Sequence, residues 1–146
     1  MKPILRTFLL IAFSSLLFLN TQCDDDGCNH CLEFDGKTIL VVDTDGNNLL
    51  FGEFAIYDPN TVQLIANNNQ EIFFFPNEET GFIEFGIEQD YETYELILSE
   101  TESDIISFET DLRPSVNCCG DVRFSTATFV NDIEVDNESL ITIIKD

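Results

Sequence analysis

The chain has 146 residues, with 28 Asp and Glu against six Lys and Arg, which gives a formal net charge of −22. This charge argues against nucleic-acid binding, because phosphate contacts require clustered Lys and Arg. The chain is also not a disordered acidic segment, since 44% of its residues are hydrophobic and 14 are Phe. Its length suits a single domain.

The first 22 residues are typical of an export signal. Lys2 and Arg6 give a positively charged start, and an apolar run from Thr7 to Leu19 follows. This run is shorter than the roughly 20 residues that a membrane-spanning helix needs. We therefore interpret residues 1–22 as a signal peptide. The mature chain then has 146 − 22 = 124 residues and a side-chain charge of 4 − 28 = −24.

Residues 23–36 are interpreted as an acidic tether. Cys23 stands where a signal peptidase would cut, and Asp24, Asp25 and Asp26 follow it directly. Asn20 and Gln22 stand where lipoprotein signals usually carry Leu and a small residue. With these two departures the segment resembles a bacterial lipoprotein signal, which implies that Cys23 receives a lipid. Several acyl chains, at about 0.8 kcal/mol per buried methylene, would hold a soluble domain firmly at a membrane.

The residues from 37 to 146 predict one all-β domain. Short, β-branched or alternating apolar segments are separated by turns about every 8–12 residues, which is typical of a β-sandwich or, alternatively, a small β-barrel. On the strand 91–98 we expect Tyr94, Leu96 and Leu98 to face the core. The expected strands cover residues 37–43, 49–57, 61–66, 71–75, 82–87, 91–98, 104–109, 122–130, 133–135 and 140–144.

Two kinds of turn are expected between these strands. Asp43-Thr44-Asp45-Gly46-Asn47-Asn48 is predicted to join the first two strands as a hairpin, because Asp-Gly and Asn-Asn favour positive φ angles. Asn67-Asn68-Asn69 is predicted to form a second hairpin turn. Gly52 is expected to mark a bulge in the strand 49–57.

Most of the eleven Phe and three Tyr of the mature chain are expected in the core, because aromatic side chains dominate the burial energy of small domains. Phe73, Phe74 and Phe75 are the exception. Successive residues of a strand point to opposite faces, so these three rings cannot all face one core. The sequence therefore predicts a partly exposed aromatic patch, which would suit an extracellular protein or glycan partner.

Four cysteines remain after Cys23, namely Cys28, Cys31, Cys118 and Cys119. In an exported protein this even number favours disulfides over a zinc or redox site. We favour pairing between the first two and the last two, in either order. Each such bond would close a loop of about 90 residues, worth about 4–5 kcal/mol on the chain-entropy model.

The cation-binding alternative rests on Asp43, Asp45 and Asn47, whose oxygens are typical calcium ligands. The segment is not an EF-hand loop, because the sixth and twelfth positions from Asp43 are Asn48 and Phe54 rather than Gly and Glu. Calcium at these three residues is therefore the second functional hypothesis, and no resident cofactor or metal is expected under the first.

The segment Cys23-Asp24-Asp25-Asp26, the turn from Asp43 to Leu50, and the later Tyr94–Leu98, Asp104–Ile106 and Cys118-Cys119-Gly120 together resemble small uncharacterised surface lipoproteins of the Bacteroidota. The resemblance implies a lipid at Cys23, an export tag at Asp24–Asp26, and a location in the outer membrane facing the cell exterior. Ile39 to Leu50 is similar to the first hairpin of transthyretin-like and Ig-like modules, which implies a sandwich of that kind.

These observations lead to a functional hypothesis. We expect a lipid-anchored, surface-exposed binding or structural domain that is not an enzyme, since the only histidine, His30, lies in the tether and no catalytic motif stands out. The partners expected are the membrane, through the lipid, and an extracellular protein or glycan. An enzyme acting on polysaccharide is the remaining alternative, because a pair of carboxylates would suffice for glycoside hydrolysis. The oligomeric state is open.

Overall fold

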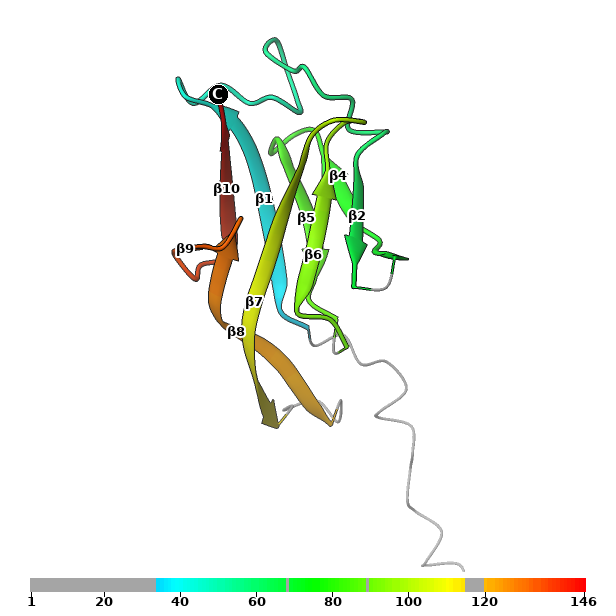
Figure 1. Cartoon of the computed structure of the whole chain (residues 1–146), viewed down its shortest axis with the longest axis vertical. Helices are drawn as coiled ribbons and strands as arrows, with labels where there is room; N and C mark the ends of the chain where they lie inside the picture. The colour runs from blue at the N-terminus through cyan, green and yellow to red at the C-terminus, as the bar shows by residue number, and fades with distance from the viewer. Residues whose placement is uncertain (1–33, 68, 89, 115–119) are drawn as a thin grey trace, which may run out of the picture.

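The computed structural model describes residues 34–146 except 68, 89 and 115–119, and this part of the chain forms ten strands and no helix (Figure 1). The expectation of an all-β domain is confirmed. The strands are β1 (Gly36–Asp43), β2 (Gln63–Ala66), β3 (Gln70–Glu71), β4 (Phe75–Asn77), β5 (Phe82–Gly86), β6 (Thr93–Ile97), β7 (Ser103–Pro114), β8 (Asp121–Val130), β9 (Ile133–Val135) and β10 (Leu140–Lys145).

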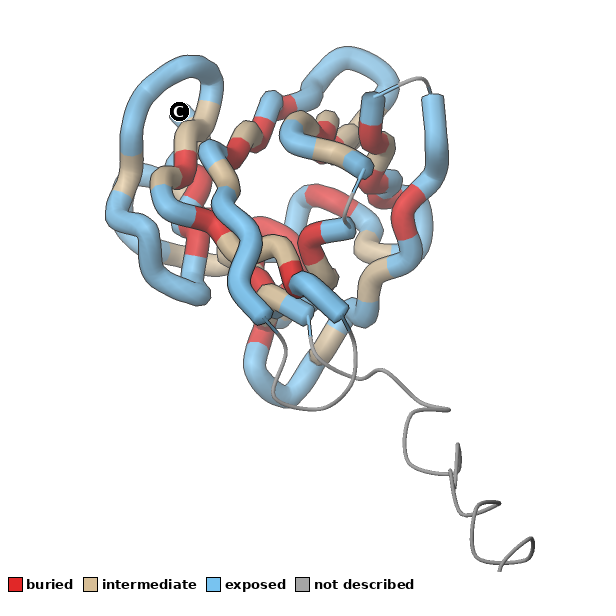
Figure 2. The backbone as a smooth tube through the Cα atoms, turned by 90° about the horizontal axis from the view of Figure 1, so that it is seen from below, coloured by how far each residue is buried: buried red, intermediate tan, exposed pale blue. Residues whose placement is uncertain are grey.

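The strands form two sheets that pack face to face. The four-stranded sheet has the order β10-β1-β5-β4, and the six-stranded sheet has the order β3-β2-β6-β7-β8-β9. The buried core draws residues from both sheets, and Figure 2 shows buried positions along the backbone of both layers. Within the described residues neither sheet closes on itself, so the molecule is a β-sandwich and not the alternative small barrel.

The core lies between the sheets because each strand alternates apolar residues inward. Tyr94, Leu96 and Leu98 are buried, as the sequence predicts. Phe85, Tyr94 and Phe108 form an aromatic cluster across the two layers, with ring centroids 5.4–6.4 Å apart. Aromatic contacts of this kind add to the burial energy that holds a sandwich together.

One pairing in the sandwich is parallel. β1 and β10 run side by side in the same direction, from Thr38 opposite Leu140 to Asp43 opposite Lys145. The other paired strands are antiparallel. The first and last strands of the described chain therefore lie side by side in the four-stranded sheet, with β10 at its edge.

The turn expected after β1 is present, with Gly46 at a φ of 86° and the Asp43 N–H donating to the Asn47 carbonyl at 3.0 Å, but the strand expected at residues 49–57 is absent. Leu49 and Leu50 are buried, but the chain makes only an isolated bridge between Val42 and Asn48. The Asn48 side chain accepts the N–H groups of Leu50 and Phe51 at 2.9 Å, and donates to the Gly81 carbonyl at 2.7 Å. This side chain turns the backbone away from β1, so the apolar residues pack as a loop, and Gly52 lies in that loop rather than at a bulge.

The strand expected at residues 71–75 is divided, because β3 ends at Glu71 in the six-stranded sheet and β4 begins at Phe75 in the four-stranded sheet. The other strands follow the sequence more closely. β2 and β3 form the short hairpin expected around Asn67–Asn69, and Asn69 has a φ of 61°. β7 is longer than expected, because it continues past an irregularity between Glu109 and Thr110 and pairs with β8 as far as Pro114. This pair extends below the rest of the sandwich in Figure 1.

Candidate functional site

Several residues singled out in the sequence lie outside the described part of the chain. They are Cys23, Asp24, Asp25, Asp26, Cys28, Cys31, Cys118 and Cys119, together with the signal peptide and His30. The lipid, the export tag and the cysteine pairing therefore stay predictions. The described part contains no helix long and apolar enough to cross a membrane.

The calcium candidates Asp43, Asp45 and Asn47 share one turn, but the Asp43 carboxylate is used within it. Asp43 Oδ1 accepts the N–H groups of Asp45 and Asn47 at 2.9 and 2.8 Å, and Oδ2 accepts the Asn47 amide at 2.8 Å. The bond from the Asn47 side chain is the main reason that the pKa of Asp43 lies below its ordinary value. This carboxylate caps the turn after β1. No cluster of three or more His, Cys, Asp or Glu side chains suited to a metal occurs among the described residues.

The exposed aromatic patch expected at Phe73–Phe75 is present. Ile72 is buried and donates its N–H to the Leu64 carbonyl at 2.8 Å, which fixes the segment to β2. Phe74 packs against the core, whereas Phe73 and Phe75 are 73% and 61% exposed. These two rings meet edge to face with centroids 4.6 Å apart. We call the Phe73–Phe75 pair the aromatic edge.

A hollow of about 590 Å³ opens beside the aromatic edge. Its walls come from the crossover between β3 and β4 and from the loop before β2. Asn60, Gln70 and Glu71 contribute polar groups, and apolar side chains supply the rest. The lining residues are Pro59, Asn60, Val62, Gln70, Glu71, Ile72, Phe73, Phe74 and Pro76. Such a mixture of apolar walls and a few polar groups is typical of a binding site.

A second hollow, of about 520 Å³, lies between the loop that follows Ile56 and the β6–β7 turn. Tyr57 is the titratable group of interest here, because its hydroxyl donates to Glu102 Oε2 at 2.9 Å. Burial, followed by the bond to Glu102, raises the pKa of Tyr57 to about 12. The phenol therefore stays protonated and serves as a structural link rather than as a base.

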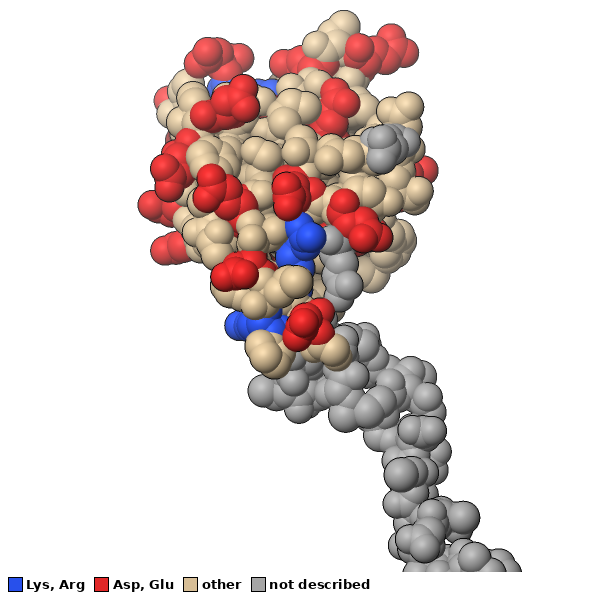
Figure 3. Space-filling model, turned by 60° about the horizontal axis from the view of Figure 1, so that its bottom comes forward, with Lys and Arg blue, Asp and Glu red and all other residues tan. Residues whose placement is uncertain are grey.

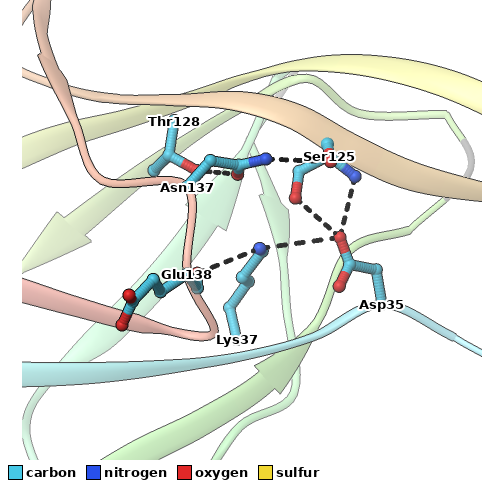
Figure 4. A network of polar contacts seen from close by, with 6 residues as sticks. All are labelled: Asp35, Lys37, Ser125, Thr128, Asn137 and Glu138. Carbon is cyan, nitrogen blue, oxygen red and sulfur yellow. Dashed lines mark hydrogen bonds and ion pairs between the residues drawn. The ribbon is translucent and has the colours of Figure 1, made fainter.

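A polar network inside the sandwich ties the start of β1 to β8 and to the loop before β10 (Figure 4). Asp35 Oδ2 accepts both the N–H and the hydroxyl of Ser125 at 2.8 Å. Lys37, only 4% exposed, lies 3.7 Å from Asp35 Oδ2 and donates to the Glu138 carbonyl at 3.2 Å.

Asn137 completes this network. It accepts the Thr128 hydroxyl at 2.8 Å and donates to the Ser125 carbonyl at 3.1 Å. Sequence reasoning missed the network, because its members are separated by up to 101 positions along the chain. One feature of the sequence could have indicated the network: Lys37 is a charged residue at the start of a largely apolar strand, where a buried charge needs polar partners. The polar groups of these residues are bonded to one another, so the network has a structural role and is not an open site. We call this network, which joins the start of β1 to β8 and to the loop before β10, the clamp.

The charges on the surface are distributed unevenly. Figure 3 shows carboxylates scattered over the lower face, with a few basic side chains gathered close to the end where the described chain begins. Arg123 on β8 donates to Glu92 Oε1 at 2.9 Å and to the Thr110 hydroxyl at 2.8 Å. Phe73 and Phe75 are the exposed large apolar side chains of the segment from Gln70 to Asn77.

The chain is a β-sandwich that exposes a pair of aromatic rings beside a surface hollow. No protein-family model matches the chain, and no curated protein or solved structure does either.

Proposed function

We propose that this chain is a lipid-anchored, non-enzymatic binding domain displayed outside the outer membrane. The aromatic edge carries the proposal. Burying one Phe side chain contributes about 1.5–3 kcal/mol, so two exposed rings in a small domain forgo several kcal/mol unless a partner covers them. An exposed apolar patch next to a hollow is the ordinary mark of an interaction site.

The proposed anchor rests on the sequence of the tether and is compatible with the fold. β1 begins at Gly36, which is 36 − 23 = 13 residues after Cys23. An extended chain spans at most about 3.3–3.6 Å per residue, so the sandwich can stand up to about 45 Å from the lipid. That reach leaves the aromatic edge free to meet an extracellular protein or glycan.

The location can be tested on intact cells. We expect wild-type protein to incorporate a labelled fatty acid and to be removed by protease shaving, and we expect Cys23→Ala to lose the label. Label retained by Cys23→Ala, or full protection from the protease, would rule out this part of the proposal.

Binding by the aromatic edge is tested by comparing three proteins on arrays of glycans and of extracellular peptides. The double variant Phe73→Ser/Phe75→Ser removes the edge, and Ile133→Ser is the matched control, because Ile133 is similarly exposed but lies on β9. We expect a ligand that wild type and control bind and that the double variant does not. Equal binding by all three proteins would contradict the proposal.

We further propose that disulfides join Cys28 and Cys31 to Cys118 and Cys119. The bonds from Ser125 to Asp35 support this, because they hold the chain four to seven residues after the first pair next to the chain six to seven residues after the second. A mass map of cysteine-linked peptides tests the pairing. Bonds formed only within each pair would contradict it.

A further inference from the structure

The outer face of the four-stranded sheet is nearly free of charge. The register places Thr38 beside Leu140 and Leu40 beside Thr142, directed away from the core. Val42 lies beside Ile144 on the same side of the sheet but is buried. Phe75 and Phe82 point the same way from β4 and β5. Glu84 is the only charged residue at an outward position of these four strands. We call Phe34, Leu40, Phe75, Phe82, Leu140 and Ile144 the apolar face; Phe75 also belongs to the aromatic edge, so a ligand on the edge and a partner on this face would compete for that ring.

Phe34 belongs to this face because two glycines make room for it. Gly36 and Gly86 lie opposite each other on β1 and β5. A Cβ atom on Gly86 would come within 2.9 Å of the Phe34 ring, and one on Gly36 within 3.4 Å. The ring therefore lies directly on the outside of the sheet, yet it stays mostly exposed.

The other sheet shows what a solvent-facing surface of this protein looks like. Glu71, Glu95, Glu109 and Glu134 all lie on its outer side, as the register of β3, β6, β7 and β9 shows. Antiparallel sheets with one face in water normally carry such polar residues there. A chain with 28 acids that leaves one sheet face with a single carboxylate has a face suited to contact with another surface.

We propose that the apolar face is a self-association surface, on which a second copy of this chain packs sheet against sheet. Charge selects this occupant. A face without charges offers a polyanion or a polycation nothing to pair with, and a polycation would seek the carboxylates found elsewhere. A second copy instead presents an equally uncharged surface, and its one carboxylate, Glu84, is already bonded to the Asn77 amide at 3.3 Å.

Geometry and area agree with such a dimer. A two-fold axis along the strands would set the aromatic side of one copy, at β4, over the aliphatic side of the other, at β10, and would leave both chain starts at the same end. Four strands about 4.8 Å apart span roughly 19 Å, and β1 and β10 pair over six residues, or roughly 20 Å. Two such faces bury about 800 Å² in total, and more with the projecting Phe rings. This is less than the roughly 1,200 Å² of a stable interface and is typical of a weak contact, so we expect an affinity no tighter than micromolar.

The test is the oligomeric state of the mature polypeptide, residues 23–146, with Cys23→Ser so that no lipid is attached. In sedimentation velocity we expect monomers to become dimers as the protein is concentrated through the range of about 10 to 100 μM expected for a small interface. Salt should strengthen the dimer, because it screens the repulsion between the two acidic copies.

The decisive variant is Ile144→Asp, with Ile133→Asp as its control. The two isoleucines are 65% and 68% exposed, but Ile133 lies on β9 of the other sheet. We expect Ile144→Asp to weaken the dimer at least about tenfold, or 1.4 kcal/mol, and Ile133→Asp to leave it unchanged. Circular dichroism checks that both variants fold. The proposal is overturned by a monomer at every concentration, by a dimer insensitive to Ile144→Asp or equally weakened by both variants, or by a dimer that reductant abolishes.

Discussion

Lys37 is the residue that best shows how this sandwich treats a buried charge. Its amine lies between the Asp35 carboxylate, the Glu138 carbonyl and the ring of Phe108, whose centroid is 5.9 Å away. A buried ammonium is costly unless such partners replace water. Because Asp35 also binds Ser125, the amine helps to hold the start of β1 against β8.

We expect Lys37→Met to lower the free energy of unfolding by about 1–3 kcal/mol, since the Glu138 carbonyl and the Asp35 carboxylate both lose a partner. Arg113→Met is the control, because Arg113 is exposed at the end of β7 and should change stability by no more than about 0.5 kcal/mol. Urea unfolding followed by circular dichroism measures both variants. Equal effects for the two would contradict the assignment of Lys37 to the clamp.

Asp43 gives a pH dependence with a definite sign. The Asn47 amide and the backbone of the turn hold the pKa of Asp43 below its unfolded value. The stability that its carboxylate contributes is therefore fully present above pH 4 and is lost as the pH falls through the lowered folded pKa. Thermal unfolding of Asp43→Ala should show a deficit relative to wild type at pH 7 that shrinks at pH 3. A deficit of the same size at both pH values would show that the charge plays no part.

For single residues, the sequence could predict only features that depend on adjacent positions in the chain. A partly exposed patch at Phe73–Phe75 could be predicted, because three consecutive rings of an extended segment cannot all face one core, although residues 72–74 connect two strands rather than forming one. The clamp could not be predicted, because Asp35 and Ser125 are 90 positions apart and only the packing of two sheets brings them together. For the same reason the sequence placed Asp35 in the tether, whereas its side chain is bound inside the fold.

At the scale of elements, β10 depends on β1 for its place in the sandwich. Its neighbour in the sheet is a parallel strand about 100 residues earlier, and its inward side chains Ile141 and Ile143 are buried in the shared core. The loop before β10 also supplies Asn137 and the Glu138 carbonyl to the clamp. The last strand is thus part of the core and not an appendage.

We expect Ile141→Ala to lower the free energy of unfolding by about 2–5 kcal/mol, because it leaves a cavity between the sheets. Ile144→Ala is the internal control on the same strand, and its exposed side chain should matter by no more than about 0.5 kcal/mol when the protein is dilute. Chemical unfolding at low protein concentration compares the two. Similar losses would mean that β10 is not seated in the core as described.

The strands that the sequence predicted well, such as β6, β8 and β9, are those in which the alternation of side chains and the flanking turns are visible within the segment itself. The segment 49–57 failed because its apolar residues indicate burial without indicating a partner. Leu49 and Leu50 are indeed buried, but the N–H groups of Leu50 and Phe51 donate to the Asn48 side chain instead of to a neighbouring strand. The parallel pairing of β1 with β10 could not be predicted either, since it joins strands from opposite ends of the domain.

At the scale of the whole molecule, charge has two opposing effects. The mature chain carries 28 acids and four bases, so its compact form experiences strong self-repulsion. Against this stand three ion pairs in the described residues, of which the Lys145–Asp104 pair is largely buried. Salt weakens repulsion between exposed charges more than it weakens a buried pair, so the net effect of salt has a sign that can be worked out.

Because repulsion outweighs these few pairs, we expect sodium chloride to stabilise the fold. A gain of about 1 kcal/mol between low and moderate salt would raise the melting temperature by roughly 4 °C in a domain of this size. The Ile144→Asp variant should be used, so that association does not add to the effect. Protonation of carboxylates removes the repulsion, so the same salt step at pH 4 should raise the melting temperature less than at pH 7. A rise that is equal at both pH values would point to a general salt effect on hydrophobic burial, and a fall at pH 7 would mean that the ion pairs outweigh the excess of acids.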